Sequence, residues 1–196
     1  MAGPGCCTGL RVVSLLGSRS LSNFAPLAWL DTFALAASLP RREGLFRAEP
    51  ERPGLRHLAI RGLRKDTLEE DEDFVGYKAA TNWPELKNLL GRIQRLGDLG
   101  GGVELGRVFL MMLDAGAMQD WRREASPYFE RWSRALVAVR SNPGVVMVIG
   151  AEAFQPGPGI LNVVSVRLPH TMANFGETPA IMLAVDFRRK ADADQA

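Results

Sequence analysis

The sequence predicts a mainly β domain with flanking helices, an antiparallel sandwich or jelly roll. From residue 103 onward, short runs of apolar and β-branched residues alternate with Gly/Pro turns, and such spacing is typical of all-β domains. The runs read VELGRVFLMML, VVMVIG, ILNVVSVRL and IMLAVDF. One segment with helical periodicity, residues 82–97, precedes these runs, and the sequence has no internal repeat.

Composition predicts a globular domain of ordinary size and excludes several classes of function. The chain has 196 residues, of which 46% are hydrophobic and 23% charged, enough to bury a core. A net charge of +2 and an aromatic content of 8% do not favour nucleic-acid binding. The only cysteines, Cys6 and Cys7, are adjacent, so no disulfide framework is expected. The absence of a Gly-x-Ser-x-Gly motif speaks against nucleophilic catalysis.

Residues 1–47 differ from the rest and predict a leader or docking segment. The first thirty residues contain Arg11 and Arg19 and several serines but no Asp or Glu, as organellar transit peptides do. A mitochondrial or plastid location follows from this interpretation, and a cytoplasmic one otherwise. Two alternatives stay open: a helix that docks on the domain or on a partner, and membrane contact through residues 26–39. The fourteen residues of that stretch, with Asp31 inside it, fall short of the roughly 20 that a membrane span needs.

The predicted domain covers residues 48–190 and is followed by a polar tail, 191–196. Near its start, GLRHLAIRGL indicates a short strand on which His57 is expected to be a structural or surface residue. The acidic run Glu69–Asp73 is interpreted as a solvated loop.

Two helices are expected within this domain. The first covers residues 82–97, with Asn82 as the N-cap and Pro84 just inside, and has leucines at helical spacing. A second is predicted in the later part of AGAMQDWRREASPYFERWSRAL, residues 115–136. It is expected because large apolar side chains recur there at helical spacing and would form a buried face: Phe129, Trp132, Leu136 and Val139.

The order of three segments resembles the aspartyl/asparaginyl β-hydroxylase family of iron(II)- and 2-oxoglutarate-dependent oxygenases. These segments are GRVFLMMLDAG (106–116), SNPGVVMVIGAEAFQPGPG (141–159) and LPHTMANFGETPAIMLAVDF (168–187). The resemblance implies a cupin-like double-stranded β-helix, with iron(II) held by imidazole and carboxylate groups. It also implies an arginine that anchors the 2-oxoglutarate carboxylate.

The positions that match the family's site are only partly retained. The second iron-binding histidine falls on His170, followed by Asn174, and the acidic ligand falls on Glu124. The first histidine falls on Arg122, which cannot ligate iron because it stays protonated. At three further site positions of the family, Arg131 is retained, Ser133 stands in place of a histidine, and Ala180 stands in place of the arginine that opens the last strand.

We therefore expect a catalytically inactive hydroxylase-like protein that serves as a structural or accessory subunit of a larger, organellar assembly and needs no cofactor. Arg122 is expected either to fill the place of the metal or to form a solvated face with Arg123, Arg131 and Arg134. One alternative is an active hydroxylase that uses iron(II) and 2-oxoglutarate through His170 and Glu124. Another is a module that binds a small ligand or a peptide in the jelly-roll cavity.

Overall fold

The computed structural model describes residues 22–64, 73–78, 82–96 and 102–190. Its larger sheet has the strand order β1-β9-β6-β11-β5-β3-β2, with β4 paired to β3, and all these pairs are antiparallel. The strands are β1 (Phe24–Trp29), β2 (Arg47–Ala48), β3 (Leu55–Leu63), β4 (Phe74–Gly76), β5 (Val103–Leu113), β6 (Ser133–Arg140), β9 (Ile160–Val164) and β11 (Ala180–Arg189).

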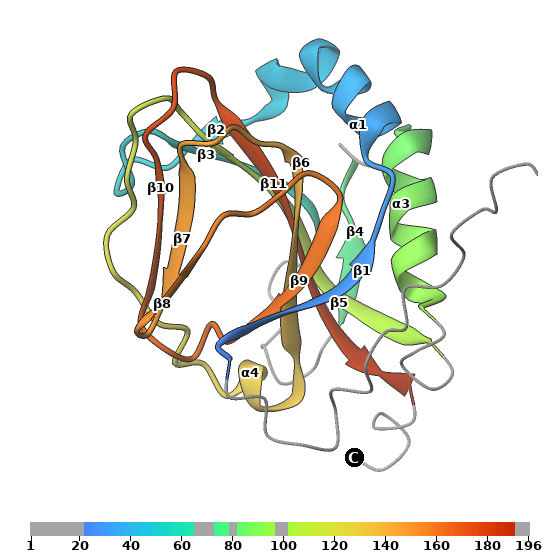
Figure 1. Cartoon of the computed structure of the whole chain (residues 1–196). Helices are drawn as coiled ribbons and strands as arrows, with labels where there is room; N and C mark the ends of the chain where they lie inside the picture. The colour runs from blue at the N-terminus through green and yellow to red at the C-terminus, as the bar shows by residue number, and fades with distance from the viewer. Residues whose placement is uncertain (1–21, 65–72, 79–81, 97–101, 191–196) are drawn as a thin grey trace, which may run out of the picture.

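A smaller antiparallel sheet faces the larger one (Figure 1). It contains β10 (His170–Asn174), β7 (Val145–Ile149) and β8 (Glu152–Phe154), in the order β10-β7-β8. The free edge of β10 is covered by the chain that follows β5, which forms isolated bridges at Met118 and Arg122. Two facing antiparallel sheets make a jelly roll, as the sequence predicts.

Successive side chains of the central strands point alternately to the two faces of the sheet, and this produces two separate hydrophobic layers. In β11, Ile181, Leu183 and Val185 contact one core, whereas Met182 and Ala184 contact the other. Successive side chains of a strand point to opposite faces, so a central strand can serve two layers at once. One layer lies between the larger sheet and the helices, and the other lies between the two sheets (Figure 1).

Helices cover the outer face of the larger sheet (Figure 1). They are α1 (Phe33–Ser38), the 3-10 helix η1 (Leu39–Leu45) and α3 (Pro84–Gln94), while the short α4 (Tyr128–Arg131) precedes β6. The predicted helix at 82–97 is confirmed as α3, but Trp83 and not Asn82 is its N-cap. The Trp83 side chain is buried, and its indole nitrogen donates to the Ser38 hydroxyl at 2.8 Å. No helix among the described residues is long and apolar enough to span a membrane.

Residues 22–47, expected to form part of a leader, contribute to the jelly roll itself. Strand β1 pairs with β9 at one edge of the larger sheet, and Leu35 of α1 belongs to the outer hydrophobic layer. The backbone of Asn23 donates to Glu152 at 3.1 Å, and its amide donates to Ile149 O at 2.9 Å. The transit-peptide interpretation rests mainly on residues 1–21, which lie outside the described residues, as do the tail and most of the acidic run.

The helix predicted after residue 127 is wrong beyond its first turn. Helix α4 ends at Arg131, and Ser133–Arg140 forms β6, which is paired with β9 and β11. The four residues of the apolar stripe are buried as expected, but they enter both hydrophobic layers instead of one face: Phe129, Trp132, Leu136 and Val139. A strand buried on both faces has apolar side chains throughout, so its pattern does not show a period of two.

Candidate functional site

The loop after β5 carries Arg122 to a position beside His170. Gly116 turns the chain with φ +73°, and its N–H donates to Asn174 O at 2.8 Å. The loop then runs along β10, where the backbones of Arg122 and His170 exchange hydrogen bonds of 3.0 and 2.7 Å. Arg122 Nε lies 3.4 Å from His170 Nε2. The Arg122 side chain therefore lies between the two sheets and not in solvent.

His170 is a buried, neutral acceptor for this guanidinium. Its Nδ1 lies 2.9 Å from Leu168 O, which can only accept, so Nδ1 carries the proton and Nε2 is free to accept from Arg122. Burial lowers the pKa of His170 below 6.5, and the positive charge of Arg122 lowers it further. The imidazole thus stays uncharged beside a cation.

Glu124 belongs to a different set of contacts, centred on Arg134. Its Oε1 accepts from Arg134 Nη1 at 3.4 Å. Arg134 also donates to both carboxylate oxygens of the fully buried Asp186, at 2.7 and 2.9 Å. The guanidinium lies between the rings of Phe109 and Phe129, 4.9 and 4.8 Å from their centroids. Burial alone would lower the pKa of Arg134, but the Asp186 carboxylate raises it above its ordinary value.

The expectation of a solvated arginine face is therefore wrong for Arg134, although Arg123 and Arg131 are exposed. Arg134 and Asp186 are neighbours in the β6–β11 ladder, on the face that points toward the smaller sheet. A charged residue in the middle of an apolar strand, such as Asp186 in IMLAVDF, is the sequence signal for such a buried pair.

The other expected site residues are divided between the interior, a turn and the surface. Ala180 is buried in the layer between the sheets. Asn174 is fully buried and holds the β10–β11 turn, because its amide donates to Leu113 O, Asp114 O and Thr178 O at 3.1, 3.1 and 2.9 Å. Arg131 and Ser133 are exposed, so neither contributes to the interior.

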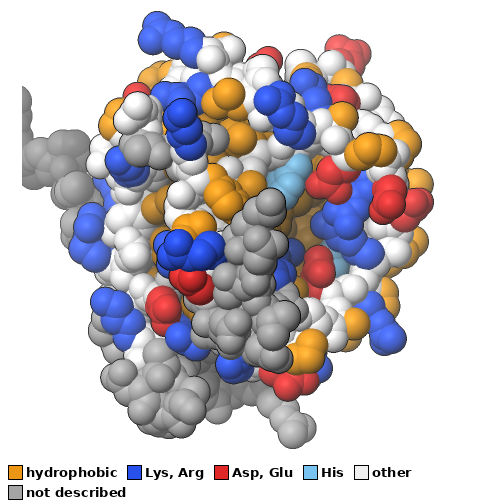
Figure 2. Space-filling model, turned by 180° about the vertical axis from the view of Figure 1, so that it is seen from behind, with side chains coloured by type: hydrophobic (Ala, Val, Ile, Leu, Met, Phe, Trp, Pro, Cys, Tyr) orange, Lys and Arg blue, Asp and Glu red, His pale blue; other side chains and the backbone are white. Residues whose placement is uncertain are grey.

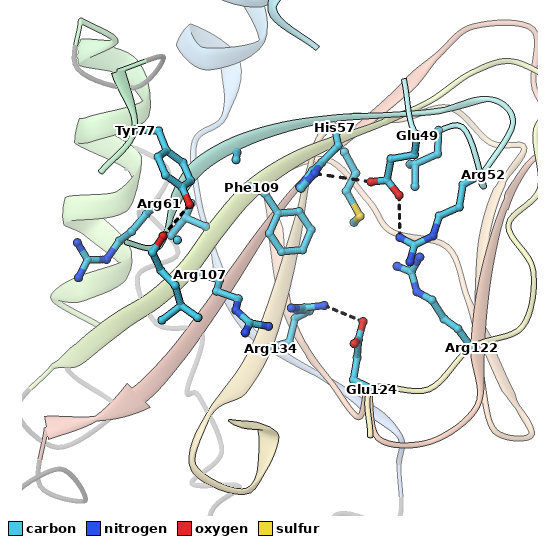
Figure 3. Close-up of a pocket in the computed structure, with 16 residues that line it drawn as sticks. Glu49, Arg52, His57, Arg61, Tyr77, Arg107, Phe109, Arg122, Glu124 and Arg134 are labelled. Atoms are coloured by element: carbon cyan, nitrogen blue, oxygen red, sulfur yellow. Dashed lines mark hydrogen bonds and ion pairs between the residues drawn. The ribbon is translucent and has the colours of Figure 1, made fainter. Parts of the chain in front are cut away.

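A cavity of about 340 Å³ opens beside this interior, on the face shown in Figure 2, where charged side chains gather around a histidine. Alternate residues of β3 (His57, Ala59, Arg61) and of β5 (Arg107, Phe109, Met111) line it. Six polar or charged residues complete the polar part of its wall: Glu49, Arg52, Tyr77, Arg122, Glu124 and Arg134 (Figure 3).

His57, which the sequence indicates as a structural or surface residue, faces this cavity. Its Nδ1 lies 3.6 Å from Glu49 Oε1, and its ring packs edge-on against Phe109. Burial lowers the pKa of His57; Glu49 opposes this effect and Arg52 adds to it. The alternation of His57, Ala59 and Arg61 along one face of β3 would have placed His57 beside Met111 and Phe109 of β5, had the pairing of these strands been known.

Comparison with known proteins identifies the fold. No family model and no curated protein matches the sequence. Among solved structures, a 2OG-Fe(II) oxygenase family oxidoreductase from Burkholderia pseudomallei has a TM-score of 0.60 at 14% identity, covering 85% of this chain and 84% of its own.

The chain has the fold of the 2OG-Fe(II) oxygenases. A second similar oxygenase-fold structure is the non-heme alpha-ketoglutarate-dependent epimerase SnoN from nogalamycin biosynthesis, with a TM-score of 0.58 at 14% identity over 84% of this chain and 77% of its own. A third is a Pseudomonas putida prolyl-4-hydroxylase, with a TM-score of 0.52 at 17% identity over 86% and 93%. Identities this low support the oxygenase fold but no particular family within it.

The residues inside this oxygenase fold do not fit an iron(II) site. Within the described part of the chain, no three His, Cys, Asp or Glu side chains are grouped to hold a metal. Of the two histidines, only His170 lies in the smaller sheet, and its Nε2 faces a guanidinium. Glu124, the other candidate ligand, is directed to Arg134. A metal would have to displace Arg122 and compete with Arg134 for the Glu124 carboxylate.

Proposed function

We propose that this chain is a catalytically inactive member of the oxygenase fold, of aspartyl/asparaginyl β-hydroxylase type, that serves as a structural or accessory subunit of a larger assembly. The position of Arg122 against His170 carries the proposal, because a guanidinium cannot give a lone pair to a metal. Ala180 adds support. It stands where the resemblance expects the arginine that anchors 2-oxoglutarate, and its methyl group is buried among apolar side chains.

An accessory role is supported by exposed apolar side chains at one edge of the larger sheet. Trp29 is 70% exposed at the end of β1 and pairs in the ladder with Ile160 of β9, which is 39% exposed. Phe33, at the start of α1, is 80% exposed. Aromatic side chains are enriched at the buried centres of protein interfaces, so this edge suits a protein partner. Placement of that partner in an organelle remains part of the proposal and depends on residues 1–21.

The alternative of an active hydroxylase requires His170 and Glu124 to act as ligands. Both side chains already have other partners, and only one of them is an imidazole. Exchange of these contacts for a metal would leave the Arg122 charge beside a divalent cation, which is electrostatically unfavourable.

Two measurements test the proposal. Purified protein loaded anaerobically with iron(II) and 2-oxoglutarate should retain no stoichiometric iron and form no succinate after oxygen is admitted. Stoichiometric iron with succinate formation would overturn the inactive assignment. Native mass spectrometry of material from the protein's own cells should show the chain in a complex that Trp29→Ser with Phe33→Ser weakens, whereas Trp121→Ser, at another exposed aromatic residue, should not. A free monomer would overturn the accessory role.

A further inference from the structure

The described residues give the 340 Å³ cavity a positively charged wall. Among them, five arginines and two glutamates line it: Arg52, Arg61, Arg107, Arg122, Arg134, Glu49 and Glu124. Two of these arginines are neutralised within the fold, Arg52 by Glu49 at 2.9 Å and Arg134 by Asp186 at 2.7 Å. Both histidines of the site have lowered pKa values and stay neutral near pH 7. A walled cavity with one excess sign of charge concentrates ligands of the opposite sign.

Arg122 is a half-buried cation in this wall. Among the described residues, no carboxylate lies within ion-pair distance of its guanidinium, and its buried Nη1 has no hydrogen-bond partner. Burial lowers the pKa of Arg122, and the nearby charge of Arg52 lowers it further. A buried donor on a charged group is costly to leave unpaired, so an oxygen ligand at Nη1 would be strongly favourable.

A second buried nitrogen without a partner lies in the same wall. His57 Nε2 makes no hydrogen bond, although its Nδ1 faces Glu49. Figure 3 shows Arg122 beside Arg52, with Glu49 between Arg52 and His57, while Phe109 and Arg134 lie on another side of the cavity. A ligand bound here therefore meets polar groups from more than one direction.

The rest of the wall is apolar. Leu55, Val108, Phe109 and Met111 line the cavity, and Phe109 presents an aromatic ring to it. The volume lies at the lower end of the range for small-molecule sites, about 300 to 1,000 Å³. Such a wall suits a ligand with a compact hydrocarbon part.

We infer that this cavity binds a small organic anion, a carboxylate on a compact apolar body, and that Arg122 holds the carboxylate. The apolar body lies against Phe109 and Met111. The residue that has replaced a metal ligand thereby becomes the recognition residue of a new site.

This inference rests in part on the proposed function, because Arg122 holds an anion only where no metal is bound. It does not depend on the accessory role. Binding is therefore measured on the full chain in EDTA, without 2-oxoglutarate or a partner. If carboxylates bind in EDTA and the protein loaded with iron(II) and 2-oxoglutarate also forms succinate, only the inactive assignment is overturned. If no carboxylate binds and no succinate forms, only the ligand site is overturned.

The experiment is isothermal titration with butyrate, hexanoate and phenylacetate, compared with phenylacetamide and inorganic phosphate. At least one carboxylate should bind, and binding should be strongest for those with the larger bodies. Phenylacetamide, which has the same shape but no charge, should bind about tenfold or more weakly than phenylacetate. Failure of all three carboxylates to bind, or equal binding of the amide, would overturn the inference. Equally tight binding of phosphate would overturn the role of the apolar wall.

Arg122→Met, matched with Arg123→Met at the exposed neighbouring position, locates the site. The first should weaken binding about tenfold to hundredfold, and the second should leave it unchanged. Equal effects of the two variants would overturn the assignment to Arg122. Nuclear magnetic resonance of the wild-type chain serves if Arg122→Met does not fold: phenylacetate should shift the His57 ring signals, and unchanged signals at saturation would overturn the inference.

Discussion

Arg122 and His170 face each other through both backbone and side chain. Their backbones exchange hydrogen bonds of 3.0 and 2.7 Å, and Arg122 Nε lies 3.4 Å from His170 Nε2. Because the backbone pairing sets the register, any side chain at position 122 starts from the same place opposite position 170. The identity of one residue therefore decides whether this part of the fold presents a metal ligand or a fixed cation.

Arg122→His should create metal affinity that the natural chain lacks. The change places a second imidazole opposite His170, with Glu124 two residues away, and removes the competing positive charge. We expect Co(II) to bind about tenfold or more tightly than to the natural chain. The measurement is absorption of the Co(II) d–d bands during titration. Arg123→His, at the exposed neighbouring position, is the control, and an equal gain in both variants would contradict the prediction.

Asp186→Asn should destabilise the fold strongly. The change leaves the Arg134 guanidinium buried without its carboxylate, and breaking a buried pair in this way costs about 3 to 5 kcal/mol. The control is Glu43→Gln, which removes a half-exposed pair with Arg140 and should cost at most about 1 kcal/mol. Urea unfolding measures both free energies. A double change, Arg134→Met with Asp186→Leu, should recover much of the loss, and similar losses in the two single variants would show that the pair is unimportant.

Both histidines should titrate below 6.5 in the folded chain, since burial lowers the pKa of each. The unfolded chain then binds more protons than the folded one as the pH falls through about 6.5, so the free energy of unfolding decreases toward acid pH. Nuclear magnetic resonance should resolve the two ring signals and their pKa values. His170→Gln should flatten the stability profile between about pH 7 and pH 5, and an unchanged profile would refute the assignment to His170.

Gly116→Ala should lower stability although there is room for a methyl group. No atom lies within 4 Å of the added Cβ, so the loss comes only from the φ of +73°, which disfavours an L side chain by about 1 to 2 kcal/mol. Gly44→Ala is a matched control, because its Cβ is also unobstructed and its φ is not positive. Urea unfolding should show a loss for Gly116→Ala alone. Equal losses would mean that the turn before Arg122 carries no backbone strain.

Much of the secondary structure follows from local pattern. The runs at β5, β7, β9 and β11 were predictable because turn residues bound them, and α3 was predictable from its leucine spacing. Strand β6 was not, because side chains on both of its faces are buried and the apolar residues around it also match helical spacing. Of the site, the sequence predicted that Arg122 and His170 belong together, and the structure places their side chains in contact. The buried pair of Arg134 with Asp186 and the position of His57 in the cavity wall were not predictable from the sequence.

The sequence by itself determined the jelly-roll class, one helix and most of the strands in the later half of the chain. Only the tertiary structure decided that Arg122 lies against His170, that Arg134 is buried with Asp186, and that His57 shares a cavity with both arginines. The physical reason is strand register. Alternation fixes the face on which a side chain lies, but the partner across the sheet depends on which strands pair and at what offset. Arg122 and His170 are separated by 48 positions in the chain, and Arg134 and Asp186 by 52. Each of these contacts forms only through that strand pairing.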